Sequence, residues 1–427
     1  MKAYLLTGLM ALFFGSAFTQ VGNTSLAECY RWAENADPRN ANDQIHRQIT
    51  RLELDNLEAT RLPSLDLNGQ AIYQSDVVEL PIEMPGFQGP ELPRERFQLT
   101  LDAGYTLYDG GRRDARAKQL QADLEVQQKD LDVQLYNLRE QVDQWYFAIL
   151  EARQQQVVLE TARQDIRERL GQLQAALEYG TITAGDLDRL RVRDLELETQ
   201  IQQAASAEQS ALRTLERLTD TTFTNDPALA LPAYDRALRN LAPQRPEFAR
   251  FEAERSRTLA AGSAITAQRQ PVVSLFLQTG LGFPNPLNFF DDALSPFAMG
   301  GVRASWTITD WKQHQRKREQ LSLRAELLEH QEASLHQSIT RTEAAYQERL
   351  QQLENQLEKQ QSVLELRRKI LAQSQQRLDR GLITATDYLE DLNAQTQADL
   401  RLDQLQLQRL RLQAEYRTRF GLSISQQ

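Results

Sequence analysis

A ten-residue pattern, L-x-x-G-x-I-T-A-x-D, occurs twice in this chain of 427 residues. It begins at Leu177 and again at Leu378, an offset of 378 − 177 = 201 residues. Asp109 in "LYDGG" and Asp310 in "ITDWK" share this offset, since 310 − 109 = 201. Self-similarity at a fixed spacing indicates one supersecondary unit used twice. The fold is therefore restricted to two copies of one arrangement, and each copy helps to interpret the other.

Two segments in each half alternate between apolar and polar residues. From Phe97 to Leu107 every second residue is apolar, which predicts a β-strand with one apolar face. Long Pro- and Gly-rich segments join the two strands of each pair, whereas soluble hairpins usually have short connections. Strands of ~10 alternating residues are typical of a membrane β-barrel, with a soluble sandwich as the alternative. The four predicted strands cover about 64–76, 96–108, 271–283 and 299–309.

After each strand pair the apolar spacing changes to three and four residues, as at Ile166, Leu170 and Leu173. This spacing predicts a coiled-coil helix, and the segment 312–379 contains no Gly or Pro. At ~1.5 Å per residue, such a helix is roughly 100 Å long. The predicted long helices cover about 112–179 and 312–379, the return helices 184–218 and 385–420, and shorter helices 41–60 and 245–267.

Four strands cannot form a closed transmembrane sheet alone. An open edge in hydrocarbon leaves backbone N–H and C=O groups unpaired, at several kcal/mol each. The membrane interpretation therefore requires oligomerisation: two copies give eight strands, three give twelve and four give sixteen. The polar faces would line a lumen and the apolar faces would contact lipid.

The N-terminus has the features of a secretory signal peptide. Lys2 precedes an apolar run that ends at Phe14, and small residues follow. We expect residues 1–20 to be removed, with a membrane anchor as the alternative. Cys29 is the single cysteine, so no internal disulfide is possible. "LAEC" permits a lipoprotein interpretation, but Ser25 followed by Glu28 favours a helix with a capping box.

Composition and spacing exclude several functions. The formal charge of −10 argues against nucleic acid as a partner, because phosphate binding needs a clustered basic surface. The mean hydropathy of −0.56 is too polar for a helical membrane bundle. The four histidines are dispersed, and His330 and His336 are six residues apart, which does not place them on one helical face. We expect no enzyme activity, cofactor or metal site.

The order of motifs resembles the TolC family of outer-membrane efflux proteins across essentially the whole mature chain. The motifs that carry the resemblance are "RLPSL", "LDAGYTLYDGGRRDA", "LEYGTITAGD", "SWTITDWKQHQR" and "RLDRGLITATDYLE". The resemblance implies an α+β membrane protein, a homotrimer in which an antiparallel α-helical coiled-coil barrel continues into a twelve-stranded transmembrane β-barrel. The expected organisation is a signal peptide (1–20), a first repeat (21–218), an irregular joint (219–246) and a second repeat (247–421).

Each copy of the ten-residue pattern predicts a tight reversal between two helices. Glycine ends a helix in the left-handed conformation, and Thr followed by Asp three residues later forms a capping box. The residues concerned are Gly180, Thr183 and Asp186 in the first copy and Gly381, Thr384 and Asp387 in the second.

The resemblance implies that these reversals form the periplasmic entrance and the contact with an adaptor protein. By position from Gly381, the acidic residues that constrict the entrance fall on Asp387 and Glu390, with Asp186 and Arg189 in the first copy as the facing candidates. Capping alone is the alternative role for the aspartates. The sequence departs from the family pattern at two positions: Asp391 stands where the family commonly has a small residue, and Asp188 where it has an aliphatic one.

The resemblance also implies function and location. The chain is expected in the cell outer membrane, with its helical barrel in the periplasm, as the export channel of a tripartite system with an adaptor and an inner-membrane transporter. A soluble periplasmic coiled-coil scaffold or adaptor is the alternative. Aromatic residues that could form the girdles of the β-barrel at the lipid interface are Tyr73, Phe97, Tyr105, Phe283 and Trp306.

Overall fold

The computed structural model describes residues 24–77, 93–178, 183–223, 228–232, 244–288 and 291–422. The expected signal peptide, Gly180 and much of the expected joint lie outside these residues. In the joint, Thr24 forms an isolated bridge with Leu229. The chain divides into two compact units, each of which takes segments from both sequence repeats.

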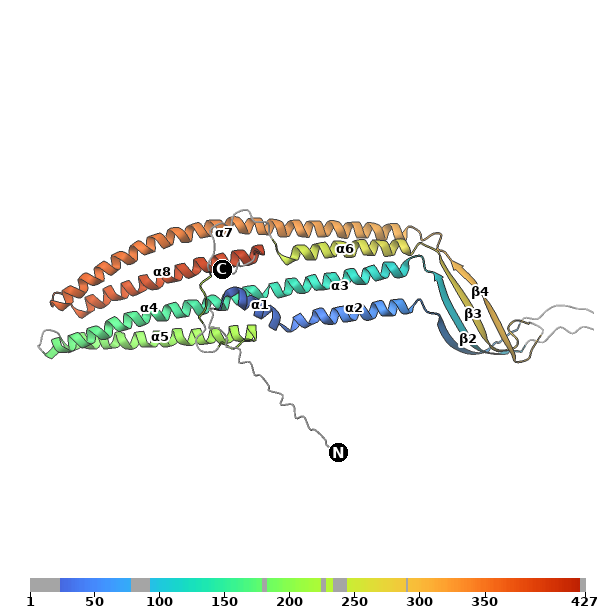
Figure 1. Cartoon of the computed structure of the whole chain (residues 1–427), viewed down its shortest axis with the longest axis horizontal. Coiled ribbons are helices and arrows are strands. Elements are labelled where there is room, and N and C mark those ends of the chain that lie inside the picture. Colours follow the sequence, from blue (N-terminus) through green and yellow to red (C-terminus); the bar gives the residue numbers. More distant parts are fainter. Residues whose placement is uncertain are drawn as a thin grey trace, which may run out of the picture. The chain divides into compact units, whose positions relative to one another are not determined.

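The first unit is helical. It contains α1 (Leu26–Ala36), α4 (Leu138–Glu178), α5 (Ala184–Thr219), α8 (Ala385–Phe420) and residues 341–379 of α7 (Gln313–Asp379). In Figure 1, α4 lies beside α5 and α7 beside α8, as two antiparallel hairpins. Leucine and isoleucine side chains at coiled-coil spacing, such as Ile166, Leu190 and Leu392, bury themselves where the hairpins meet.

Helix α1 begins at the capping box expected from the sequence. The Ser25 amide donates to Glu28 Oε2 at 2.8 Å, and the Glu28 amide donates to Ser25 Oγ at 3.3 Å. Cys29 is fully buried in the core cluster beside Leu26 and Tyr30. Burial raises the pKa of its thiol to about 12, so this cysteine remains a neutral core residue.

The second unit combines helices with the sheet. Its helices are η1 (Pro38–Ala41), α2 (Asn42–Ala59), α3 (Arg112–Tyr136), α6 (Pro246–Ala267) and the α7 residues up to Thr340. Its strands are β1 (Ser64–Tyr73), β2 (Glu95–Tyr108), β3 (Val272–Phe283) and β4 (Ser295–Ser305), antiparallel in the order β1-β2-β3-β4. The predicted combination of long antiparallel helices and four antiparallel strands is confirmed.

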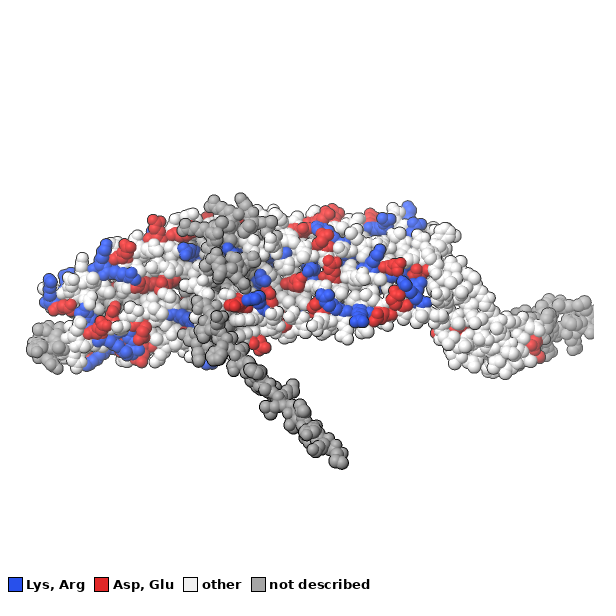
Figure 2. All heavy atoms as spheres, viewed as in Figure 1, with Lys and Arg blue, Asp and Glu red and all other residues white. Residues whose placement is uncertain are grey.

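The two faces of the sheet differ in chemistry. One face is apolar and exposed, as shown by Leu67 at 71% and Val302 at 65%. On the opposite face, Asp102 accepts hydrogen bonds from Asn68 Nδ2 at 2.7 Å and from Gln278 Nε2 at 2.6 Å. Figure 2 shows charged atoms of both signs over the helices and almost none over the sheet. Among the described residues, β1 and β4 each pair on one side only.

The first long helix was expected to run unbroken over 112–179, and this prediction is wrong. The structure has two helices there, α3 and α4, separated at Asn137. Asparagine is a poor helix former because its amide competes for backbone hydrogen bonds. No Pro or Gly lies near Asn137 to indicate the break, and Gly171, the glycine within 112–179, lies far from it.

The predicted position of the fourth strand, 299–309, is also wrong. Strand β4 begins at Ser295, and Trp306 and Ile308 lie beyond its end. Pro296 lies before the predicted strand, yet it pairs with Leu281 in the sheet. Proline is largely confined to strand starts, bulges and edge strands, and Pro296 is the second residue of β4, which pairs on one side only within the described chain. Strand β1 ends at Tyr73, three residues earlier than expected.

No helix in the described residues has the length and hydropathy needed to cross a membrane.

Candidate functional site

The reversal between α7 and α8 has the geometry that the sequence predicts. Gly381 has a left-handed φ of +67°, and its amide donates to the Leu378 carbonyl at 2.9 Å. Thr384 then starts α8, and its Oγ1 accepts from the Asp387 amide at 3.3 Å. Asp387 Oδ2 in turn accepts from the amide of Thr384 at 2.9 Å and from its hydroxyl at 2.7 Å. The second reversal is therefore closed by a complete capping box.

Asp387 and Glu390 are both exposed and lie one turn apart at the start of α8. The hydrogen bonds from the Thr384 hydroxyl and amide lower the pKa of the Asp387 carboxyl below its usual value. Asp387 is thus ionised at neutral pH while it caps the helix. Capping and a negative charge at the tip do not exclude each other.

The first reversal repeats this chemistry where the structure describes it. Thr183 Oγ1 accepts from the Asp186 amide at 3.2 Å, and Asp186 Oδ2 accepts from the Thr183 hydroxyl at 2.7 Å. Arg189 follows on the second turn of α5 and is exposed. Gly180 lies outside the described residues, so the match between the two tips rests on the Thr–Asp boxes.

Two further carboxylates near the tips have partners within the chain. Asp391 is partly buried and accepts a hydrogen bond from the Ser374 hydroxyl of α7. Asp188 is exposed and lies 3.1 Å from Arg191 on its own helix. Asp391 therefore links α7 to α8, whereas Asp387 and Glu390 are the exposed acidic pair of the second tip.

A buried arginine that was not expected from the sequence links the two hairpins. Arg169 of α4 is only 4% exposed, and its Nη1 lies 2.5 Å from Asp379 Oδ1 of α7. The same guanidinium lies 5.7 Å from the ring centre of Tyr388 on α8 and donates to Gln172 at 2.7 Å. Three helices thus meet at one cation immediately behind the tips.

A sequence signal for this residue exists. Arg169 follows Ile166 by three positions and precedes Leu173 by four, so it occupies the apolar seam of the coiled coil. A charged residue in such a seam is expected to have a specific partner, since an unpaired buried charge is costly. The partner, Asp379, is 210 positions away in sequence and could not be identified without the structure.

The expected aromatic girdle residues lie near the two ends of the sheet. Tyr73 is the last residue of β1, and Phe97 pairs with Phe283 at that same end. Tyr105 pairs with Leu275 toward the other end. Trp306 lies just after the end of β4, not within the strand as expected. The residues thus fall at the two ends of the sheet, as a pair of girdles requires, and the girdle role stays a prediction.

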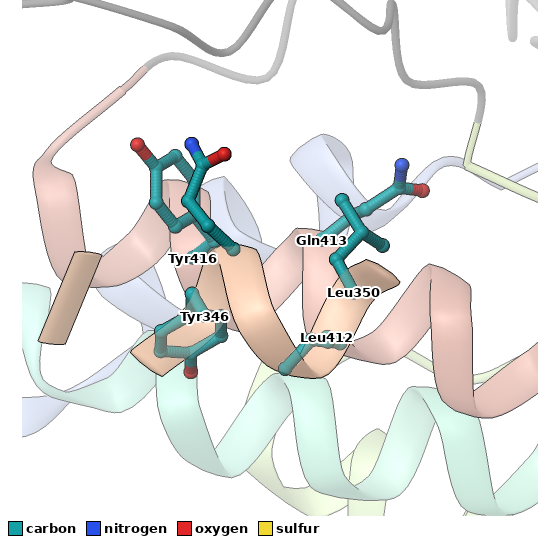
Figure 3. Close-up of a pocket in the computed structure, with 6 residues that line it drawn as sticks. Tyr346, Leu350, Leu412, Gln413 and Tyr416 are labelled. Carbon is teal, nitrogen blue, oxygen red and sulfur yellow. The ribbon is translucent and has the colours of Figure 1, made fainter. Parts of the chain in front are cut away.

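A cavity of about 320 Å³ lies between α4 and α8 in the first unit and is lined by polar side chains that include Gln154, Arg401 and Asp403. A second cavity of this unit is far smaller. A groove between α7 and α8, shown in Figure 3, has a cavity of about 30 Å³ lined by Tyr346, Leu350, Leu412, Gln413 and Tyr416. This volume accommodates about one water molecule. In the described parts of the chain, no three His, Cys, Asp or Glu residues lie close enough to hold a metal ion.

Comparison with known families agrees with the motifs. Residues 44–221 match the model of the outer membrane efflux protein family. This match confirms the resemblance expected from the sequence, and the family is one of transport proteins in the outer membrane. A search of curated protein sequences gives no significant match.

Solved structures match nearly the whole chain. The outer membrane protein VceC of Vibrio cholerae has a TM-score of 0.66 and 14% identity, with 94% of this chain and 97% of that chain covered. The MtrE outer membrane channel of Neisseria gonorrhoeae, in its open state, has a TM-score of 0.65 and 16% identity, with 94% of this chain and 89% of that chain covered. The CmeC outer membrane channel of Campylobacter jejuni has a TM-score of 0.61 and 15% identity, with 94% of this chain and 87% of that chain covered. At these identities the likeness establishes the fold.

Proposed function

From the match of residues 44–221 to the outer membrane efflux protein family and from the fold shared with outer membrane channels, we propose that this protein is the outer-membrane duct of a tripartite export system. Substrates would pass from an inner-membrane transporter, with its periplasmic adaptor, through the duct to the exterior. The helical hairpins would lie in the periplasm and the sheet would cross the membrane.

The four-stranded sheet is the observation that carries this proposal. Its exposed apolar face fits contact with hydrocarbon, and its hydrogen-bonded polar face fits a water-filled lumen. Strands β1 and β4 each have one unpaired edge in the described chain, and a sheet in lipid cannot keep unpaired edges. Pairing β4 of one copy with β1 of the next removes both edges, and the family resemblance favours three copies with twelve strands.

A soluble scaffold or adaptor is the competing function. It would require another part of the protein to cover the apolar face of the sheet. In the described residues this face stays exposed over both strand pairs, at Leu65 and Leu67 as well as at Leu277 and Val302. An uncovered apolar surface of this kind is costly in water and favourable in lipid.

We further propose that the tips form the entrance. Three copies would place three Asp387 and three Glu390 carboxylates around the axis, which favours cations and makes the closed entrance self-repulsive. Asp186 and Arg189 of the neighbouring hairpin would face this ring, with Arg189 as an ionic latch. Gly180, Thr183, Gly381 and Thr384 shape the outer surface of the tips, which we propose as the adaptor contact.

Single-channel recording in planar bilayers tests the entrance. The double variant Asp387→Asn/Glu390→Gln keeps side-chain size and leaves an acceptor for the capping box, but removes both charges. We expect block by a trivalent cation to weaken at least tenfold, and the alanine double variant should also conduct more. Glu358→Gln, an exposed acid within α7, is the control. If both double variants are blocked by the trivalent cation as strongly as wild type, Asp387 serves only as a helix cap.

A further inference from the structure

Basic residues collect where the long helices begin beside the sheet. Residues 312–318 include Lys312, Arg316, Lys317 and Arg318 and no acid, although the whole chain has 49 basic and 59 acidic residues. The first turn of α7 contains no acidic residue. The helix dipole favours acids at this end, so helix stability does not explain the cations.

The junction between β4 and α7 has the same left-handed backbone as the first junction, between β2 and α3, but carries different residues. Gly110 and Gly111 have left-handed φ values of +70° and +78°, and the positions 201 residues later are Trp311 and Lys312, at +52° and +67°. Both junctions share the same cap: Asp109 accepts from the Arg113 amide at 2.9 Å and Asp310 from the His314 amide at 2.9 Å.

Non-glycine residues are uncommon in the left-handed conformation, and two in succession are a genuine outlier. Trp311 is 80% exposed, so core packing does not account for it. A bulky residue held in a strained position on the surface points to a function for its side chain. In the first repeat, glycine is required at Gly110, because a Cβ would come within 2.5 Å of the Gln270 Cβ.

A cavity of about 180 Å³ lies at this second junction, between the end of α6 and the start of α7. We refer to it as the junction pocket. It is lined by Ile265, Gln268, Arg269, Thr307, Ile308, Asp310, Gln313, His314 and Lys317. Its two permanent cations, Arg269 and Lys317, are exposed, and in the described chain neither forms an ion pair with a carboxylate.

Hydrogen bonds occupy the one acidic group of the pocket. Arg269 Nη1 lies 3.2 Å from His314 Nε2, and a guanidinium can only donate, so Nε2 is the acceptor. The proton of His314 is then on Nδ1, which donates to Asp310 Oδ2 at 2.9 Å. Asp310 also accepts from the backbone amides of Lys312 and His314. Both oxygens of the Asp310 carboxylate thus accept hydrogen bonds from His314 or the backbone, and Arg269 and Lys317 remain available to bind an anion.

The apolar side of the pocket matches a membrane interface. Trp306, Ile308 and Trp311 are all largely exposed and directly follow strand β4. Trp306 Nε1 donates to the Arg269 carbonyl at 3.0 Å, which fixes the indole beside the pocket. Tryptophan collects at the boundary between lipid and water, where its ring contacts acyl chains and its N–H meets polar groups.

We propose that the junction pocket binds the phosphate of an anionic phospholipid at the periplasmic face of the membrane. Arg269 and Lys317 contact the phosphate, and Trp306, Ile308 and Trp311 contact the upper acyl chains. This inference rests on the proposed membrane-spanning function. The site anchors the duct at a fixed depth, where strand β4 ends and helix α7 begins.

Native mass spectrometry of the protein released from nanodiscs tests the proposal. The nanodiscs contain phosphatidylethanolamine with a minor fraction of phosphatidylglycerol, and retained lipids are counted. We expect wild type to retain phosphatidylglycerol selectively and Arg269→Ala/Lys317→Ala to bind it roughly 30-fold more weakly, about fivefold per cation. The control Lys359→Ala/Arg367→Ala, on exposed positions further along α7, should bind it like wild type.

Three results would overturn the lipid site. One is equal retention of phosphatidylglycerol by wild type and Arg269→Ala/Lys317→Ala. Another is binding of inorganic phosphate by the detergent-solubilised protein as tightly as lipid, which would indicate a free-anion site. The third is loss of oligomer without loss of lipid in Trp311→Ala, which would assign these aromatic residues to contacts between copies. Failure to enter nanodiscs at all would instead contradict the proposed function.

Discussion

Asp143 gives the most quantitative prediction about the helical unit. It is 3% exposed and joins three helices. Its Oδ1 accepts from the Tyr30 hydroxyl of α1, and the Thr418 hydroxyl of α8 donates to Oδ2 at 3.4 Å. Glu415 and Arg411 of α8 form an ion pair with each other at 3.0 Å. Glu415 raises the pKa of Asp143 and Arg411 lowers it. Burial raises the pKa of Asp143 to about 7, against the lowering effect of the Tyr30 hydrogen bond.

The sign of the pH dependence follows from linkage. An aspartate in the unfolded chain has a pKa of about 3.9, so the folded protein keeps a proton that the unfolded chain loses. The stabilisation of the folded protein by this proton is complete below about pH 4 and is lost as pH rises toward 7. Three pKa units correspond to about 4 kcal/mol in all, of which about 3 kcal/mol falls between pH 4.5 and pH 8.

Asp143→Asn removes the titration and keeps an oxygen acceptor for Tyr30. We expect the variant to match wild type within about 1 kcal/mol at pH 4.5 and to be more stable by about 3 kcal/mol at pH 8. Urea unfolding in detergent can be followed by tryptophan fluorescence, because Trp32 and Trp145 pack against the same core cluster. Glu358→Gln is the exposed control. Parallel stability curves for Asp143→Asn and wild type across this range would refute the reasoning.

Other predictions concern the tips. Asp379→Asn should cost about 3 kcal/mol because it leaves the buried Arg169 without its carboxylate, whereas Arg169→Met should cost only about 1 kcal/mol because Asp379 is half exposed. Equal costs in urea unfolding would contradict this asymmetry. Thr384→Ala removes the cap of α8 and should cost about 1 kcal/mol, while Thr384→Ser should restore it. Gly381→Ala should cost about 1 kcal/mol through its left-handed φ alone, since its Cβ would meet no atom within 4 Å.

Periodicity and duplication were enough to predict the elements of the fold. Residue spacing distinguishes strands from helices, and the 201-residue offset places the Thr–Asp boxes at both tips. Two predictions were wrong for local reasons. The first long helix breaks at Asn137 without a nearby Pro or Gly, and the fourth strand, which is an edge strand within the described chain, includes Pro296. The pairing of strand edges in a barrel depends on other copies, which a single chain cannot supply.

The candidate site divides in the same way. The caps at Thr183 and Thr384 depend on residues three positions apart and could be read directly from the sequence. The Arg169–Asp379 pair joins residues on different hairpins, so its partner depended on the fold. Asp391 could not be separated from Asp387 by sequence, because only the structure shows that it bonds to Ser374.

The proposed duct requires that the sheet closes only with other copies and only in a membrane. Fractionation of the expressing cells followed by native mass measurement of the detergent extract tests it most directly. The proposed duct requires recovery in the outer-membrane fraction, release only by detergent and a mass of three mature chains. Recovery of a monomer in the soluble fraction without detergent would contradict it.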